Sequence, residues 1–216
     1  STKGTITKQD TKETTFTAEN PILKFKSEFH LNLPGVFNVS NALGVINLAT
    51  LLGVSPQSID QTFSTFEGVG RRLDKIGETK DNIIVYEDYG HHPSAIKVTL
   101  GALRQRYPRE KLWAIVEPHT FSRTKAVLPL YKNAFDEANE VIITPIFKSR
   151  DSSEFGISGN SIVEVADHPH IRHINDFEQI IAYVKKNVKP KTVVVVFGAG
   201  KSYYLVRDLM KSLTTS

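Results

Sequence analysis

The sequence predicts an α/β protein whose C-terminal part is a doubly wound, mostly parallel, Rossmann-like sheet, preceded by a smaller piece of strands and helices. From about residue 73, short apolar strands alternate with helical patterns, as in a parallel sheet covered by helices. Residues 193–196 are four valines in a row, and a strand that is apolar on both faces suits the centre of such a sheet. Residues 3–33, in contrast, read as strands joined by polar turns.

The first part of the chain contains strands and two helices. We expect strands over residues 4–8, 14–17, 22–26 and 29–33, and a helix over 41–52 that Gly53 ends. Ser55 is expected to cap a second helix that opens with Pro56 and buries Ile59 and Phe63. The glycine-rich, basic stretch 68–72 reads as a flexible joint, which divides the chain into domains 1–70 and 71–216.

The second part follows the alternating pattern to its end. Strands are expected over residues 83–86, 112–116, 140–144 and 192–197, with a short strand near 171–174. Helices are expected over residues 93–107, 125–138, 161–165, 176–187 and 201–213.

Composition limits the classes of function. Of the 216 residues 40% are hydrophobic, but no apolar run approaches the roughly 20 residues of a membrane helix, and the polar N-terminus does not resemble a signal peptide. We therefore expect a cytoplasmic protein that does not contact membranes. The absence of cysteine excludes disulfides and thiolate chemistry. The net charge of +4 comes from scattered lysines and arginines, which favours a phosphorylated small molecule over nucleic acid as the ligand.

The ends of two predicted strands carry the candidate site. Asp88, His91 and His92 follow the strand 83–86, and His119 and Arg123 follow the strand 112–116. Ligands of open α/β sheets bind outside the carboxyl ends of the strands, where a guanidinium suits a carboxylate or a phosphate. The alternatives are a solvated acidic turn, and an Arg123 that caps or pairs within the following helix. The pair Arg71–Arg72 is either a solvated corner or a charge that a closing movement brings onto a phosphate.

Three other patterns have simpler interpretations. Residues 197–202 look like the end of a phosphate-binding P-loop, but Val195 stands where that motif needs glycine. A tight strand-to-helix turn is favoured there, with a helix N-terminus that attracts anions weakly. His168, His170 and His173 are read as surface histidines, so no metal site is predicted. Asn38 and Asn41 flank the expected start of the first helix, where one of them can be a cap.

Five blocks together resemble the Mur ligases, and their order and spacing agree with that family from about residue 30 to the end. Within the family they match best the members that join L-alanine to UDP-N-acetylmuramate. The blocks are Leu33-Pro34-Gly35 with Asn38 and Asn41, residues 68–72, residues 88–93, His119 with Arg123 and Thr124, and residues 198–200.

The resemblance implies that residues 1–70 are the last part of a central ATPase domain and that residues 71–216 are a complete C-terminal domain. The family's UDP-sugar domain, its P-loop and its magnesium ligands have no counterpart in this sequence. We therefore expect the chain to be an incomplete fragment that is inactive alone.

The resemblance also implies a reaction and a set of roles. ATP, with Mg²⁺ held mainly by the missing part, would phosphorylate the carboxylate of UDP-N-acetylmuramate, and L-alanine would attack the acyl phosphate. The implied catalytic residues are Arg72, on the ATP phosphates, and Asp88, on the ribose. The implied cofactor-binding residues are Asn38, Asn41, Arg72, Asp88 and Tyr89, with Asn41 on the adenine. The implied substrate-binding residues are His91, His92, His119 and Arg123.

The sequence departs from the family pattern at Phe37, Glu87, Thr120 and the segment 145–151, which leaves the amino-acid acceptor open. The competing interpretations are a ligase that recycles a murein tripeptide and a non-catalytic module that binds a nucleotide or a precursor. A nucleic-acid binder, suggested by the basic composition, is a third.

Overall fold

The computed structural model describes residues 2–215, which form two compact units. The first contains the chain up to Gly68 together with Gly101–Pro108, and the second contains Val69–Leu100 and the chain from Arg109 onward. Each unit has its own hydrophobic core. They are therefore described separately.

The first unit is a three-stranded antiparallel sheet with two helices. Its strands β1 (Lys3–Gln9), β2 (Thr14–Asn20) and β3 (Phe25–Leu31) lie in that order, and α1 (Val36–Leu51) and α2 (Pro56–Thr65) follow. Four strands were expected, and this was wrong, because residues 25–31 form one strand. The Asn20 side chain accepts the backbone N–H groups of Ile22 and Leu23, so the chain turns there instead of continuing as a strand.

The first helix begins five residues before its predicted start at Asn41. Its N-cap is Gly35, with φ of 93°, so Asn38 and Asn41 lie inside the helix and the capping expectation was wrong. The Asn38 amide donates to the Pro34 carbonyl at 2.8 Å, and the Asn41 amide donates to Asn38 Oδ1 at 3.2 Å. The second helix is as predicted, because Ser55 Oγ accepts the Ser58 N–H at 3.2 Å.

The second unit contains a six-stranded sheet in the order β4-β5-β9-β6-β7-β8. The strands are β4 (Asp74–Glu78), β5 (Ile83–Asp88), β6 (Lys111–Val116), β7 (Glu140–Ile143), β8 (Ile171–His173) and β9 (Thr192–Phe197). Only β4, which was not predicted, runs antiparallel to its neighbour; the other pairs are parallel. The valine-rich β9 lies between β5 and β6, so the predicted fold class and the central place of this strand are confirmed.

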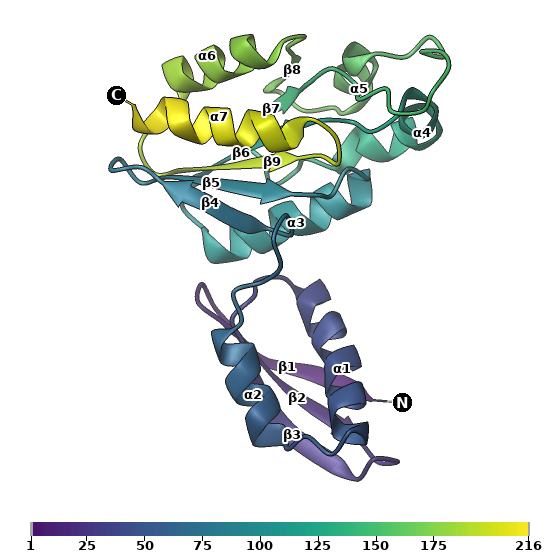
Figure 1. The fold of residues 1–216 in the computed structure, drawn as a ribbon, viewed down its shortest axis with the longest axis vertical. Coiled ribbons are helices and arrows are strands. Elements are labelled where there is room, and N and C mark those ends of the chain that lie inside the picture. Colours follow the sequence, from purple (N-terminus) through teal and green to yellow (C-terminus); the bar gives the residue numbers. More distant parts are fainter. Residues whose placement is uncertain (1, 216) are drawn as a thin grey trace. The chain divides into compact units, whose positions relative to one another are not determined.

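Helices cover both faces of this sheet (Figure 1). Alternate residues of the strands pack against α6 and α7, including Val85 of β5, Ile115 of β6 and Val196 of β9. Figure 1 shows α3 on the opposite face. The helices are α3 (Pro93–Arg106), α4 (Phe121–Val127), α5 (Gly159–Val165), α6 (Phe177–Asn187) and α7 (Ser202–Thr214), with a 3-10 helix η1 (Leu128–Asn133).

The predicted helix over residues 125–138 was wrong. Thr120 caps α4 through a 3.3 Å hydrogen bond from the Arg123 N–H, so the helix begins at Phe121. It ends at Val127, and residues 128–133 continue as η1. Pro129 has no N–H to donate, which explains why regular α-helix does not continue past this point.

The parallel register brings three loops to one edge of the sheet. Phe197 of β9 is paired with Asp88 of β5 on one side and with Val116 of β6 on the other. The segments that follow these residues, 89–92, 117–120 and 198–201, therefore start at the same level. This edge holds most of the predicted site residues.

Candidate functional site

Asp88 ties two loops together. It is the last residue of β5 and is 7% exposed. One carboxylate oxygen accepts the Leu73 N–H at 2.8 Å, and the other accepts the Gly90 N–H at 2.6 Å. Burial raises the pKa of Asp88, and these two hydrogen bonds act against that rise. The carboxylate therefore fixes the loop of Arg72 against the loop of His91.

Arg72 stands out from a strained turn. The residues on either side of it, Arg71 and Leu73, have φ of 61° and 51°, which non-glycine residues seldom adopt. Arg72 itself is exposed, and its guanidinium lies 5.1 Å from the centre of the Tyr89 ring. Strained backbone of this kind gathers at functional sites. The turn presents the charge of Arg72 to solvent.

Arg71 has a different environment from its neighbour. Its Nε donates to Glu87 Oε1 at 2.7 Å, and its terminal nitrogen donates to the Gly198 carbonyl at 3.3 Å. The guanidinium also lies 5.0 Å from the Tyr89 ring and 5.6 Å from the Tyr203 ring. Arg71 is thus a structural anchor, and the description of both arginines as a solvated corner was wrong for it.

The anchor's partner, Glu87, was noted in the sequence only as a departure from the family. It is 0% exposed, and its second oxygen lies 3.6 Å from Arg207 of α7. An acidic residue within an otherwise apolar strand signals a buried partner. That signal could have identified Glu87 beforehand.

His91, His119 and Arg123 form a compact cluster. His91 Nε2 contacts a terminal nitrogen of Arg123, and the rings of His91 and His119 are 5.1 Å apart. Burial lowers the pKa of both imidazoles, and the Arg123 charge lowers each further. A guanidinium flanked by two neutral imidazoles favours an anionic ligand such as a carboxylate. The predicted neighbourhood of the two strand ends therefore exists.

His92 and Tyr89 complete the loop after β5. His92 Nδ1 accepts the Ser94 N–H at 3.2 Å, so this side chain caps the start of α3. His92 is only half-buried, which leaves part of its ring accessible. Tyr89 lies edge-on to His91, with ring centres 5.9 Å apart, so one aromatic ring contacts both the arginine anchor and the histidine cluster.

The loop after β6 is strained at Thr120, whose φ is 62°. A β-branched residue is a true outlier in this region of backbone space. The following helix receives a second anchor from Asp151, which accepts both the Ser122 N–H and the Ser122 hydroxyl at 2.8 Å. These hydrogen bonds lower the pKa of Asp151. The segment 145–151 is therefore held beside the start of α4.

Glu117 lies at the same edge of the sheet as the predicted site residues, and it was not identified from the sequence. It follows β6, is 2% exposed, and accepts the N–H groups of Gly200, Lys201 and Ser202. The P-loop-like segment 197–202 is a strand-to-helix turn, as predicted, and the anion at its helix N-terminus is the protein's own carboxylate. The signal was an acid directly after an apolar strand.

The remaining candidates lie elsewhere. Asn38 and Asn41 belong to α1 in the first unit, where Asn41 is exposed. His168 contacts the Ala138 carbonyl and His173 contacts the Ile143 carbonyl. Among residues 2–215 there is no group of three or more His, Cys, Asp or Glu placed to hold a metal ion. In the same residues, no helix is long and apolar enough to cross a membrane.

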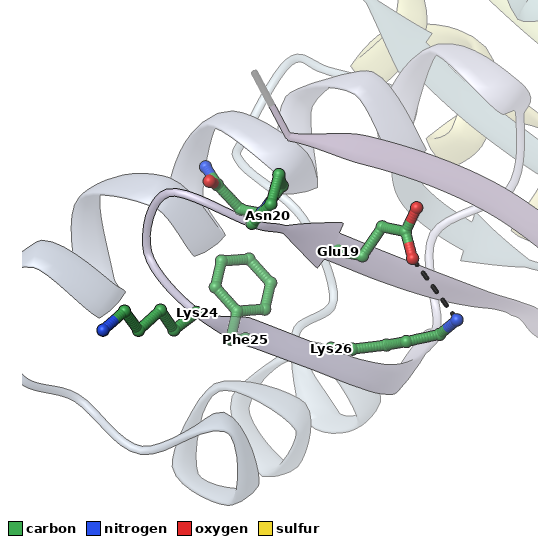
Figure 2. Close-up of a pocket in the computed structure, with 6 residues that line it drawn as sticks. Glu19, Asn20, Lys24, Phe25 and Lys26 are labelled. Carbon is green, nitrogen blue, oxygen red and sulfur yellow. Dashed lines mark ion pairs between the residues drawn. The ribbon is translucent and has the colours of Figure 1, made fainter.

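A pocket of about 390 Å³ in the first unit contains none of the predicted residues (Figure 2). It lies at the turn between β2 and β3, where Lys26 pairs with Glu19 at 3.3 Å. The Asn20 amide there donates to Thr2 and Asn47. Glu19, Lys26 and Asn20 thus already have partners within the first unit, so the pocket gives no evident ligand chemistry.

Fold and site together define a doubly wound α/β domain with a cluster of His91, His119 and Arg123 at the carboxyl ends of β5 and β6. Residues 71–200 match the family described as "Mur ligase, glutamate ligase domain". A UDP-N-acetylmuramate–L-alanine ligase from Alkaliphilus metalliredigens is 37% identical over 184 residues, which cover 84% of this chain and 39% of the relative. The enzyme of the same name from Brachyspira hyodysenteriae is 35% identical over 86% of this chain and 40% of its own length.

The solved structures agree. The crystal structure of the UDP-N-acetylmuramate–alanine ligase from Thermotoga maritima matches with a TM-score of 0.78 and 25% identity, over 96% of this chain and 45% of that chain. A murein peptide ligase from Psychrobacter arcticus shares the fold, with a TM-score of 0.68 and 21% identity over the whole of this chain and 44% of its own. The chain belongs to the Mur ligase family, and it spans about two fifths of the length of these curated relatives.

Proposed function

We propose that this chain works as the C-terminal part of an ATP-dependent ligase of peptidoglycan precursor synthesis that joins L-alanine to UDP-N-acetylmuramate. The cluster of His91, His119 and Arg123 carries the proposal. An amino acid presents a carboxylate, and the guanidinium of Arg123 beside two neutral imidazoles suits that group. Binding the carboxylate leaves the amine free to attack the acyl phosphate of the lactyl group, which forms the amide and releases inorganic phosphate.

The nucleotide is assigned to the neighbouring loop. Arg72 is exposed and carries a full charge, which fits an ATP phosphate. Asp88 uses one lone pair on each oxygen for backbone N–H groups, so each oxygen can still accept a ribose hydroxyl. Tyr89, Asn38 and Asn41 are also proposed for the nucleotide, with Asn41 on the adenine, whereas His92 is proposed for the substrate. ATP supplies the phosphoryl group that activates the carboxylate, and Mg²⁺ is assigned to other parts of the ligase.

The test is phosphate release from ATP by the complete protein that carries this chain. The assay contains Mg²⁺ and UDP-N-acetylmuramate and compares L-alanine, other amino acids and the murein tripeptide. Release that depends on L-alanine is expected. Release only with the tripeptide would assign a recycling ligase, and the absence of release with every one of these acceptors would favour a binding module.

Variants test the residue assignments. Arg123→Gln is expected to raise KM for L-alanine at least tenfold, because one charge-assisted contact contributes about 1.5–3 kcal/mol. Lys125→Gln removes an equal charge from the same helix, about half a turn away, and should leave KM unchanged. Arg72→Ala should lower kcat. For Asp88 the suitable variant is Asn, which keeps one acceptor oxygen, whereas Ala would leave both the Leu73 and the Gly90 N–H groups unpaired.

A further inference from the structure

Three backbone N–H groups in the turn that leads into α7 converge on the Glu117 carboxylate. Gly200 and Lys201 donate at 3.0 Å and Ser202 donates at 3.1 Å. The backbone N–H of Glu117 in turn donates to the Phe197 carbonyl at 2.9 Å. A carboxylate that accepts several N–H groups at a helix N-terminus is held in one orientation. Glu117 therefore joins the end of β6 to the start of α7.

The packing around this carboxylate leaves no room for an additional atom. A Cβ added at Gly200 would lie 2.5 Å from Phe147 Cγ and 2.8 Å from Glu117 Oε2. A Cβ at Gly198 would lie 2.9 Å from Glu117 Cβ. The turn, the carboxylate and the Phe147 ring are thus in direct contact, and the glycines allow this approach.

Phe147 continues the contact to His119. Its N–H donates to the Pro118 carbonyl and its carbonyl accepts the Thr120 N–H, both at 2.8 Å, so its backbone brackets His119. The rings of Phe147 and His119 are 5.5 Å apart. His119 Nδ1 is buried and has no hydrogen-bond partner, so packing sets the orientation of this ring.

We propose that Glu117 is a positioning residue that fixes the His119 ring by locking the 198–202 turn against Phe147. Without the carboxylate, three N–H groups lose their acceptor and the turn loses its fixed distance from β6. The Phe147 ring then loses its packing contact with Gly200 and shifts, and the His119 ring, which packs against Phe147, shifts as well. The P-loop-like turn serves as a clamp on the loop after β6.

The test is the NMR signal of the His119 ring in the 216-residue chain. Glu117→Ala should shift the His119 Cε1–H resonance by more than its linewidth, and added formate should move it back by filling the vacated carboxylate position. Glu117→Gln keeps one acceptor oxygen and should give a smaller shift. Gly200→Ala keeps the carboxylate but displaces Phe147, so it should also shift the signal.

The matched control is Leu209→Ala, which removes core packing from α7 without touching the turn. It should lower the melting temperature and leave the His119 resonance in place. A resonance unchanged in Glu117→Ala, or one that Leu209→Ala shifts equally, would overturn the proposal. Should Glu117→Ala fail to fold, unchanged His119 signals in both Glu117→Gln and Gly200→Ala would overturn it.

The consequence for catalysis rests on the proposed function. If His119 contacts the amino acid, Glu117→Gln in the complete ligase should raise KM for that substrate with little change in kcat. The NMR result does not depend on ligase activity. If the wild-type complete protein has no ligase activity but the His119 signal shifts in Glu117→Ala, the proposed function is refuted and the positioning role stands. If the wild-type protein is active but the His119 signal does not shift, the positioning role is refuted and the proposed function stands.

Discussion

Glu87 and Asp88, the last two residues of β5, have different partners because successive side chains of a strand point to opposite faces of the sheet. Glu87 has the same parity as Val85, which packs against the helices α6 and α7, and it meets Arg71 and Arg207. Asp88 instead binds the backbone of its two flanking loops. The same alternation places Glu117 on the face of Ile115, and therefore with α7.

Glu87→Gln should lower the free energy of unfolding of the second unit by about 2 kcal/mol, because the hydrogen bond from Arg71 loses its buried charged acceptor. Urea unfolding followed by circular dichroism measures this change. Glu140→Gln is the matched control, since Glu140 pairs with Arg172 at a more exposed site and such pairs contribute at most about 1 kcal/mol. Equal losses in the two variants would contradict the structural role of Glu87.

The histidine cluster gives a pH dependence with a definite sign. The pKa values of His91 and His119 lie below their ordinary value of 6.5, mainly through burial. The unfolded chain therefore binds more protons than the folded chain as the pH falls below 6.5, and these residues reduce stability from that point downward until both are protonated in the folded state.

An NMR titration of the two imidazoles should find both midpoints below 6.5. Arg123→Gln should raise both midpoints, since it removes a nearby positive charge, but should not restore them fully because burial is the larger cause. Lys125→Gln serves as the charge-removal control and should leave them unchanged. Midpoints that do not respond to Arg123→Gln would separate this arginine from the cluster.

At the level of single elements, a capping side chain predicted the start of a helix correctly where it bonds a backbone N–H a few residues along the chain. Ser55 before Pro56 defines the start of α2 as the sequence predicts. The start of α1 was missed because its N-cap is a glycine with no side-chain signal, and its first turn carries polar residues such as Asn38. The end of α4 depended on the change to η1 at Leu128, next to Pro129.

Ser55→Ala should lower the free energy of unfolding of the first unit by about 1 kcal/mol, because the Ser58 N–H loses its acceptor. The comparison is Ser64→Ala in the last turn of the same helix, whose hydroxyl bonds only the carbonyl of Gln61 and where alanine is a better helix former. Denaturant unfolding of both variants decides the matter. A Ser64→Ala loss as large as that of Ser55→Ala would rule out the cap as the cause.

For the whole molecule, the second unit has a core that its own strands and helices complete. A fragment of residues 69–216, which keeps α3 intact, should therefore fold alone and unfold cooperatively in urea. Its His91 and His119 resonances should match those of the full chain. A fragment without a cooperative transition would mean that the second unit needs the first, and the predicted boundary at residues 70 and 71 would have to move.

The sequence by itself determined the alternation of strands and helices, the central place of β9, and the gathering of His91, His119 and Arg123 at one sheet edge. These follow from local periodicity and from the rule that parallel strands end together. Only the tertiary structure decided that Arg71 is an anchor while Arg72 is exposed, and that Glu117 binds the turn before α7. Those roles depend on which residues distant in sequence become neighbours once the strands are paired, and no local pattern specifies such contacts.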